Sequence, residues 1–353
     1  MLSRLLSNDL PRSRVLAAIL IAIVLGLAFA PFLFPGVKAL NVAAKVLIFI
    51  VLVAAFDLLL GYTGIVSFAH TMFFGIGAYG IAIACTRLGP TWGALAVGLG
   101  GALLVSLLLS LAIGLFSLRV RAIFFAMITL AVASAFAILA SQLSGFTGGE
   151  DGRSFRVPPE LRPAFKLFEE PVLGLDITGK VLTYYILFAT ALALFLLALR
   201  VVNSPFGSVL KAIRENDFRT EALGYRTVVF RTKVNCLAAA MAVVAGGLNA
   251  LWLRYTGPDT TLSFAIMLDI LLMVVIGGMG TLYGAVVGAT LFIVAQNYLQ
   301  KLMGTASAAT EGLPLLPKLL HPDRWLLLLG ILFVLSVYFF PTGIVGRLRS
   351  GGR

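Results

Sequence analysis

Two acidic residues, Asp57 and Asp269, lie inside long apolar runs of this 353-residue chain. A carboxylate at membrane depth is costly, and such residues commonly line the path of a substrate or an ion. The alternative is structural, because a carboxylate can also accept hydrogen bonds from interrupted backbone nearby. We therefore treat both aspartates as candidates for a translocation pathway and keep the structural role as the alternative.

Glycine-rich stretches interrupt the apolar runs shortly after each aspartate. Non-helical backbone at membrane depth is tolerated only where protein or water covers it, and its freed N–H groups can bind a carboxylate or carbonyl. We predict that both stretches line the pathway, the alternative being plain cytoplasmic turns. The candidate residues in the first stretch are Gly61, Gly64, Ser67 and His70, and those in the second are Gly277, Gly278, Gly280 and Thr281.

Residue types for catalysis or metal binding are scarce. The two histidines, His70 and His321, belong to no Cys/His cluster, and a zinc site needs three or four closely placed ligands. Cys85 and Cys236 lie in apolar segments, and we predict that both are small buried hydrophobic residues. Residues 75–80 fit GxGxxG, but no strand precedes them, so close helix packing is the better explanation. We predict no metal site, no bound cofactor and no enzymatic activity.

Residues 174–181 nearly match a phosphate-binding P-loop. The final position is Val181, so the hydroxyl that would hold Mg²⁺ is missing. We predict that this chain has no ATPase site of its own.

A charged segment from Arg200 to Lys233 separates apolar runs in the second half of the chain. Ser204 can cap a helix that has Pro205 at its first position, and Gly224 can end it. Glu215 and Arg219 have the i,i+4 spacing of an ion pair. The sequence predicts one short surface helix over residues 204–224 that docks a soluble partner, the alternative being a solvated loop. Its expected exposed residues are Arg214, Glu215, Asn216 and Glu221.

The elements that must carry these residues are membrane-spanning helices. The chain is 60% hydrophobic and 12% charged, whereas soluble domains are about 45–50% apolar and about 25% charged. A span takes about 20 residues. The fold is therefore predicted as all-α, a polytopic helical bundle in one domain (1–353). Ten spans can be drawn, at residues 15–34, 39–60, 68–87, 91–117, 121–141, 181–200, 229–253, 262–279, 282–300 and 324–340.

Basic residues set the predicted orientation. The net charge of +12 comes from residues near span ends, which the positive-inside rule explains better than nucleic-acid binding. Four basic clusters are separated by even numbers of spans, so both termini are predicted to be cytoplasmic. The outer face then carries the loops 142–180 and 301–323. The clusters are Arg4, Arg12 and Arg14; Arg119 and Arg121; the 200–233 segment; and Arg347, Arg349 and Arg353.

A short stretch in the first half of the chain is similar in sequence to a stretch in the second half. Residues 56–60 read FDLLL and residues 268–272 read LDILL, and each is followed by a glycine-rich break and a helix of small residues. Transporters are often built from two repeats, with the substrate near interrupted helices at the midplane. We predict two pseudo-repeated halves.

Three blocks of this sequence resemble the branched-chain amino acid permeases of the LivH/LivM type. They are DLLLGYTGIVSFAHTMFFGIGAYG (57–80), GSVLKAIRENDFRTEALGY (207–225) and MVVIGGMGTLYGAVVGA (273–289). TGGEDG (147–152) and YFFPTGIVG (338–346) fit the LivM branch best. Residues 201–228 are similar to the cytoplasmic coupling loop of ABC-importer permeases. The resemblance implies that Ala212, Arg214, Glu215, Asn216, Glu221, Ala222 and Gly224 contact an ATPase.

The resemblance also implies partners. They are a second, LivH-like permease or a second copy of this chain, two cytoplasmic ATPases that hydrolyse ATP with Mg²⁺, and a periplasmic binding protein. The setting would be the lipid of a bacterial inner membrane, with no nucleic acid involved. The continuation RSFRVPPELRPAFKLFEEPV (153–172) is more charged than is usual in the family. The substrate is therefore left open among branched-chain amino acids, urea, and aromatic or small carboxylates.

A rival function is an ion-coupled secondary transporter, in which Asp57 or Asp269 would be the coupling site. Such a transporter needs no ATPase and no charged surface helix at residues 204–224. The segment therefore favours an ATP-driven importer.

Overall fold

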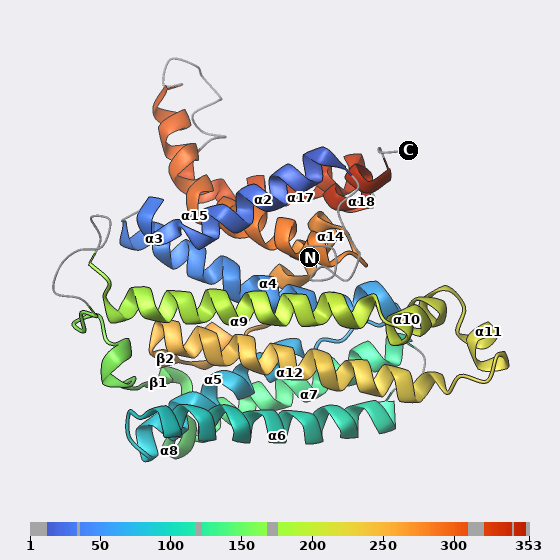
Figure 1. Ribbon diagram of the computed structural model, residues 1–353, viewed down its shortest axis with the longest axis horizontal. Helices are drawn as coiled ribbons and strands as arrows, with labels where there is room; N and C mark the ends of the chain where they lie inside the picture. The colour runs from blue at the N-terminus through green and yellow to red at the C-terminus, as the bar shows by residue number, and fades with distance from the viewer. Residues whose placement is uncertain are drawn as a thin grey trace.

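Long apolar runs form helices because backbone N–H and C=O groups in lipid must be satisfied within their own segment. The computed structural model describes residues 13–33, 36–117, 122–167, 176–309, 321–340 and 342–350. Each predicted span has a helix (Figure 1). These helices are α2 (Arg14–Ala28), α4 (Val37–Thr63), α5 (His70–Arg87), α6 (Trp92–Ser117), α7 (Ala122–Gln142), α9 (Gly179–Val202), α12 (Thr227–Leu253), α14 (Phe264–Gly277), α15 (Leu282–Ala309) and α17 (Trp325–Phe339).

Shorter elements join or follow these helices. They are α3 (Ala30–Leu33), α8 (Ser144–Thr147), η1 (Gly149–Asp151), β1 (Arg153–Ser154), η2 (Pro159–Leu161), α10 (Pro205–Glu215), α11 (Asp217–Ala222), β2 (Tyr255–Thr256), α13 (Pro258–Thr261), η3 (Pro322–Arg324) and α18 (Gly343–Ser350).

Seven helices within the described ranges are long and apolar enough to cross a membrane: α4, α6, α7, α9, α12, α14 together with α13, and α15. The chain is thus a helical membrane protein. Three predicted spans correspond to weaker candidates. Helices α2 and α17 have 15 residues each, and α5 has 18 residues with His70 and Arg87 at its ends. The count of ten spans and the two-halved layout stay predictions.

Helix α5 packs against α12 and α6. Its glycines allow this contact, because a side chain at Gly77 would collide with the backbone of Val243 on α12. In return, a side chain at Gly246 of α12 would collide with the backbone of Phe74. Small residues let helices approach closely in this way. The packing explanation for residues 75–80 is confirmed.

The two ends of the bundle differ in character (Figure 1). The strands β1 and β2 pair antiparallel, with Arg153 opposite Thr256, and lie at one end with α8. The start of α2, helices α10 and α11, and α18 lie at the other end. The basic residues Arg14, Arg347 and Arg349 therefore share an end with the charged segment. Five positions of the predicted basic clusters and parts of both outer loops lie outside the described residues. The positions are Arg4, Arg12, Arg119, Arg121 and Arg353, and the loop parts are residues 168–175 and 310–320.

The charged segment forms two short helices, whereas one helix over residues 204–224 was predicted. Ser204 caps α10, with its hydroxyl accepting from the Gly207 N–H at 3.4 Å and with Pro205 at the first position. Asn216 is extended (φ −160°) and ends α10, and its Oδ1 then caps α11 by accepting from the Arg219 N–H at 2.9 Å. The chain turns after α11 at Gly224, which has a φ of +92°.

The interruption at Asn216 also removes the predicted i,i+4 relation, because Glu215 and Arg219 lie on different helices. Another ion pair holds this region. Asp217 of α11 pairs with Arg231 of α12 at 2.9 Å. Glu221 accepts a hydrogen bond from the Thr227 hydroxyl at 2.6 Å. Helix α11 is therefore tied to the start of α12.

Candidate translocation and coupling site

The two glycine-rich breaks are shorter than the sequence predicts. Helix α4 continues through Gly61 to Thr63 and ends at Gly64, whose φ of +71° is left-handed. Residues 64–69 form the turn before α5. The second break follows α14, at Gly278 (φ +118°) and Gly280 (φ +79°). These positive φ angles favour glycine, which has no Cβ to clash.

The breaks meet each other at Asp57. This carboxylate is 1% exposed, and its Oδ1 accepts the Gly280 N–H at 2.9 Å. Gly61 lies one turn further along α4, where any side chain would collide with Asp57 and the Gly280 backbone. The second break is thereby fastened to α4. Asp57 therefore accepts a hydrogen bond from non-helical backbone. This is the structural role that was predicted from the sequence as the alternative to a pathway role.

Arg214 of α10 joins the same contact. Its guanidinium donates a hydrogen bond to the carbonyl oxygen of Gly61. A methyl group on Gly280 would lie 2.6 Å from a guanidinium nitrogen of Arg214 and 2.8 Å from the Gly61 oxygen. One surface helix therefore touches the point where α4 meets the α14–α15 break. We call Asp57, Gly61, Arg214 and Gly280 the junction.

Ser67 and His70 lie beside the junction but in the core, both 0% exposed. The imidazole of His70 packs edge-on against Phe56, with ring centroids 5.1 Å apart. The Ser67 hydroxyl accepts from the Ala69 N–H at 3.4 Å. Thr281 donates to the carbonyl of Gly278 at 2.8 Å and shapes the second break. A role of these residues in translocation stays a prediction.

Asp269 does not lie at the junction. It sits on α14 roughly two helical turns before the break, and its Oδ2 accepts from the Gln296 side-chain amide at 3.4 Å. The Gln296 Oε1 in turn accepts from Lys45 Nζ of α4 at 3.0 Å. Lys45 and Gln296 were not among the residues predicted from the sequence. The rule that selected the aspartates, a charged group inside an apolar run, also selects Lys45.

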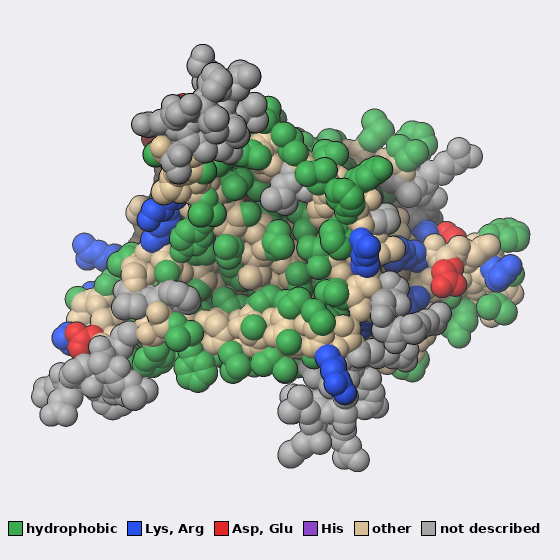
Figure 2. Space-filling view, turned by 90° about the horizontal axis from the view of Figure 1, so that it is seen from above, with side chains coloured by type: hydrophobic (Ala, Val, Ile, Leu, Met, Phe, Trp, Pro, Cys, Tyr) green, Lys and Arg blue, Asp and Glu red, His purple; other side chains and the backbone are tan. Residues whose placement is uncertain are grey.

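The predicted coupling residues lie on a projecting surface. Of these, Arg214, Glu215, Asn216, Glu221, Ala222 and Gly224 are exposed, and Ala212 is half-buried. Two large apolar side chains accompany them, Phe218 at 84% exposed and Leu223 at 72%. Figure 2 shows acidic, basic and hydrophobic side chains together at the end of the molecule that α10 and α11 form. Such a mixture is typical of a protein-binding surface.

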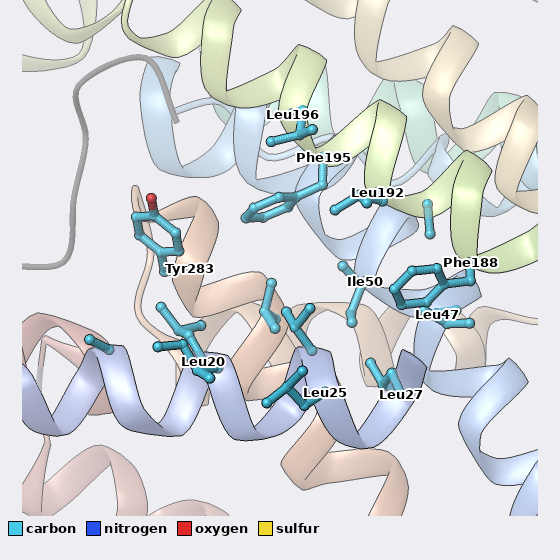
Figure 3. A pocket seen from close by; sticks show the side chains of 15 residues that line it. Leu20, Leu25, Leu27, Leu47, Ile50, Phe188, Leu192, Phe195, Leu196 and Tyr283 are labelled. Atoms are coloured by element: carbon cyan, nitrogen blue, oxygen red, sulfur yellow. The ribbon is translucent and has the colours of Figure 1, made fainter. Parts of the chain in front are cut away.

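A cavity of about 580 Å³ lies elsewhere, between α2, α4, α9 and α15 (Figure 3). Leu20 and Leu25 of α2 face Phe195 and Leu192 of α9 across it. Its lining is almost wholly apolar, so a polar solute would lose its hydration there without replacement hydrogen bonds. This cavity therefore does not suit the predicted pathway.

A smaller cavity of about 290 Å³ lies beside the first break and is more polar. Thr71, Ser134, Asp259 and Ser263 are among its lining residues. In the part of the chain that the structure describes, no group of three His, Cys, Asp or Glu residues is placed to hold a metal ion.

The comparison with known families decides what these helices belong to. Residues 38–337 match the family model described as "Branched-chain amino acid transport system / permease component". The chain belongs to this family. The matched range contains the junction, α10 and α11. The protein is therefore the permease component of a transport system, a membrane subunit and not a catalytic enzyme.

Individual relatives agree. The chain is 25% identical over 328 residues to the high-affinity branched-chain amino acid transport system permease protein LivM of Salmonella typhimurium, covering 88% of this chain and 71% of the relative. LivM of Escherichia coli is 26% identical over 326 residues, covering 88% and 70%. A probable LivM of Methanocaldococcus jannaschii is 30% identical over 175 residues, 47% of each chain. No solved structure matches.

Proposed function

We propose that this chain is the LivM-type subunit of an ATP-driven importer for branched-chain amino acids. It works with a LivH-like permease, two cytoplasmic ATPases that use ATP and Mg²⁺, and a periplasmic binding protein that delivers the substrate. The subunit lies in the inner membrane with ten spans in two pseudo-repeated halves and with both termini cytoplasmic. Family membership and the names of the relatives support the transported class.

The coupling proposal rests on the hydrogen bond between the Arg214 guanidinium and the Gly61 carbonyl. Helix α10 buries Gly207, Leu210 and Ile213 against the bundle and contacts α4. It extends one cation to the Gly61 carbonyl, beside the Asp57–Gly280 hydrogen bond. A push on α10 would therefore act directly on the contact between the two breaks.

The mechanism follows from this arrangement. ATPase closure displaces α10 and α11, and Arg214 transmits the displacement to the end of α4. The Asp57–Gly280 contact then yields, so that the α14–α15 break separates from α4 on the cytoplasmic side. Opening exposes backbone donors and acceptors of both breaks, which a passing solute can use in place of water.

Glu215 provides the test, because it is exposed at the end of α10 and contributes nothing to the apolar face. The Glu215→Lys variant, reconstituted with its three kinds of partner in proteoliposomes, should lose at least ~10-fold of its ATP-dependent leucine uptake. A tenfold loss corresponds to about 1.4 kcal/mol of coupling. Membrane abundance should not change.

The matched control is Glu150→Lys, an equal charge reversal at an exposed site on the other end of the bundle. It should retain uptake and stimulation of the ATPase by loaded binding protein. Wild-type uptake and stimulation in Glu215→Lys would refute the coupling role. Uptake by the wild-type complex without ATP would refute the importer itself.

A further inference from the structure

A second polar cluster lies away from the junction, where α4, α14 and α15 contact one another. Lys45 donates to the Gln296 Oε1 at 3.0 Å, and the Gln296 Nε2 donates to the Asp269 Oδ2 at 3.4 Å. One amide therefore separates a basic side chain from an acidic side chain. All three side chains are half-buried, so the cluster lies at the margin of the packed core.

The cost of this arrangement argues for a use. Charged residues within membrane spans are costly and usually serve a path or a ligand. A purely structural ion pair would be expected to be in direct contact. The Coulomb attraction that offsets the desolvation cost of two charged groups is largest at direct contact. In the part of the chain that the structure describes, no direct ion pair joins Lys45 to Asp269. Gln296 holds their charges apart.

The position of the cluster separates it from the coupling machinery. Lys45 lies about 18 Å before Asp57 along α4, at about 1.5 Å per residue. Helix α4 runs toward the end of the molecule that carries α10 (Figure 1). In the proposed orientation, a substrate arriving from the periplasm would meet the cluster before the junction.

We propose that Lys45, Gln296 and Asp269 form a binding site for the zwitterionic end of an amino acid. The α-carboxylate accepts from Lys45 and the α-ammonium donates to Asp269, so the solute inserts where the Gln296 amide now bridges. Both groups of a free amino acid are charged near neutral pH and are attached to one carbon. A cation and an anion one amide apart match that spacing. This inference rests on the proposed function, because it assigns the site for the proposed substrate.

Phe49 supports the resting geometry. Lys45 Nζ lies 5.6 Å from the centroid of the Phe49 ring, within the range of a cation–π contact. This contact keeps the ammonium in place when Gln296 turns aside. Apolar residues make up most of the remaining surface of the three helices, and an aliphatic side chain of the solute can lie against them.

The experiment measures uptake and binding with the complete complex in proteoliposomes. Lys45→Met and Asp269→Asn should each lower leucine uptake at least ~10-fold at wild-type abundance. Lys45→Arg should retain more uptake than Lys45→Met, because it keeps the charge. Lys38→Met is the matched control, since Lys38 is an exposed cation at the start of the same helix, and its uptake should be unchanged.

A binding measurement separates recognition from structure. Radiolabelled leucine should bind the purified permease pair without binding protein. Leucine should compete with the label, while leucinamide and 4-methylpentanoate, which each lack one of the two charges, should compete at least ~10-fold more weakly. Equal competition by all three compounds would overturn the zwitterion site, and loss of the second permease from Lys45→Met or Asp269→Asn would assign the cluster to subunit contact instead.

Failure of this inference differs from failure of the proposed function. If the wild-type complex imports leucine and both variants import it equally well, the site assignment is wrong and the importer stands. If the wild-type complex imports no branched-chain amino acid, the proposed substrate is wrong.

Discussion

Single residues in this protein join segments that are far apart in the sequence. Asp57 is buried and accepts the backbone N–H of Gly280, more than two hundred positions later. Arg214 reaches the Gly61 carbonyl from a surface helix. A buried carbonyl without its donor costs about 1–3 kcal/mol, so the junction is sensitive to each partner.

Arg214→Met is expected to uncouple the permease from the ATPases. The substitution keeps most of the apolar stem and removes the donor to Gly61. Stimulation of ATP hydrolysis by loaded binding protein should fall at least ~5-fold, since about 1 kcal/mol of contact is lost. The ATPases should still co-purify, because the exposed surface of α11 is unchanged.

The conservative and distant variants complete this test. Arg214→Lys should retain part of the stimulation, since an ammonium can donate to one carbonyl. Arg200→Met removes an exposed cation at the end of α9 and should behave as wild type. Equal stimulation in Arg214→Met and Arg200→Met would show that the guanidinium transmits nothing.

At the scale of elements, helices α10 and α11 form a surface distinct from the bundle. Phe218 and Leu223 are exposed there, although large apolar side chains are usually buried in a water-facing helix. The salt bridge from Asp217 to Arg231 orders α11 on the start of α12. The surface is therefore preformed, which lowers the entropy cost of docking.

Phe218→Ser is expected to weaken binding of the ATPase subunits. An exposed aromatic anchor commonly contributes about 2 kcal/mol or more to an interface, so co-purification should drop at least ~10-fold at low subunit concentration. Tyr338→Ser is the control, because Tyr338 is 78% exposed on α17. Undiminished co-purification of the ATPases with Phe218→Ser would place the docking surface elsewhere.

Element positions could be predicted from the sequence because hydropathy and caps act locally. Ser204 and Pro205 correctly marked the start of α10, and Gly224 correctly marked the turn after α11. The interruption at Asn216 was missed, although asparagine is a strong N-cap residue and its Oδ1 caps α11 by accepting from the Arg219 N–H. The meeting of Gly61 with Gly280 depends on tertiary packing. Asp57 and Asp269 were both predicted as pathway residues because they lie inside apolar runs, but the structure gives them different partners.

At the scale of the whole molecule, the fold separates two polar regions along α4. The junction lies near the end that carries α10, and Lys45 lies toward the other end. An importer that alternates access needs recognition and gating at different depths of the membrane. The separation along one helix suits that need, and α4 is the element that would connect both events.

The orientation of the molecule in the membrane can be measured with single cysteines placed at its two ends. Ser154 in β1 and Leu223 after α11 are exposed and lie at opposite ends of the molecule (Figure 1). Arg14, Arg347 and Arg349 lie at the Leu223 end together with the charged segment, and the positive-inside rule favours the cytoplasm for that end. An impermeant maleimide should therefore label Ser154→Cys from the periplasm and label Leu223→Cys only after permeabilisation.

Thr342→Cys, exposed just before α18, should behave like Leu223→Cys if α17 crosses the membrane. The native cysteines are buried or half-buried, and a variant with both replaced by alanine gives the background. Labelling of Ser154→Cys and Leu223→Cys from one side would disprove the proposed orientation, and labelling of Thr342→Cys from the periplasm would disprove the ten-span count.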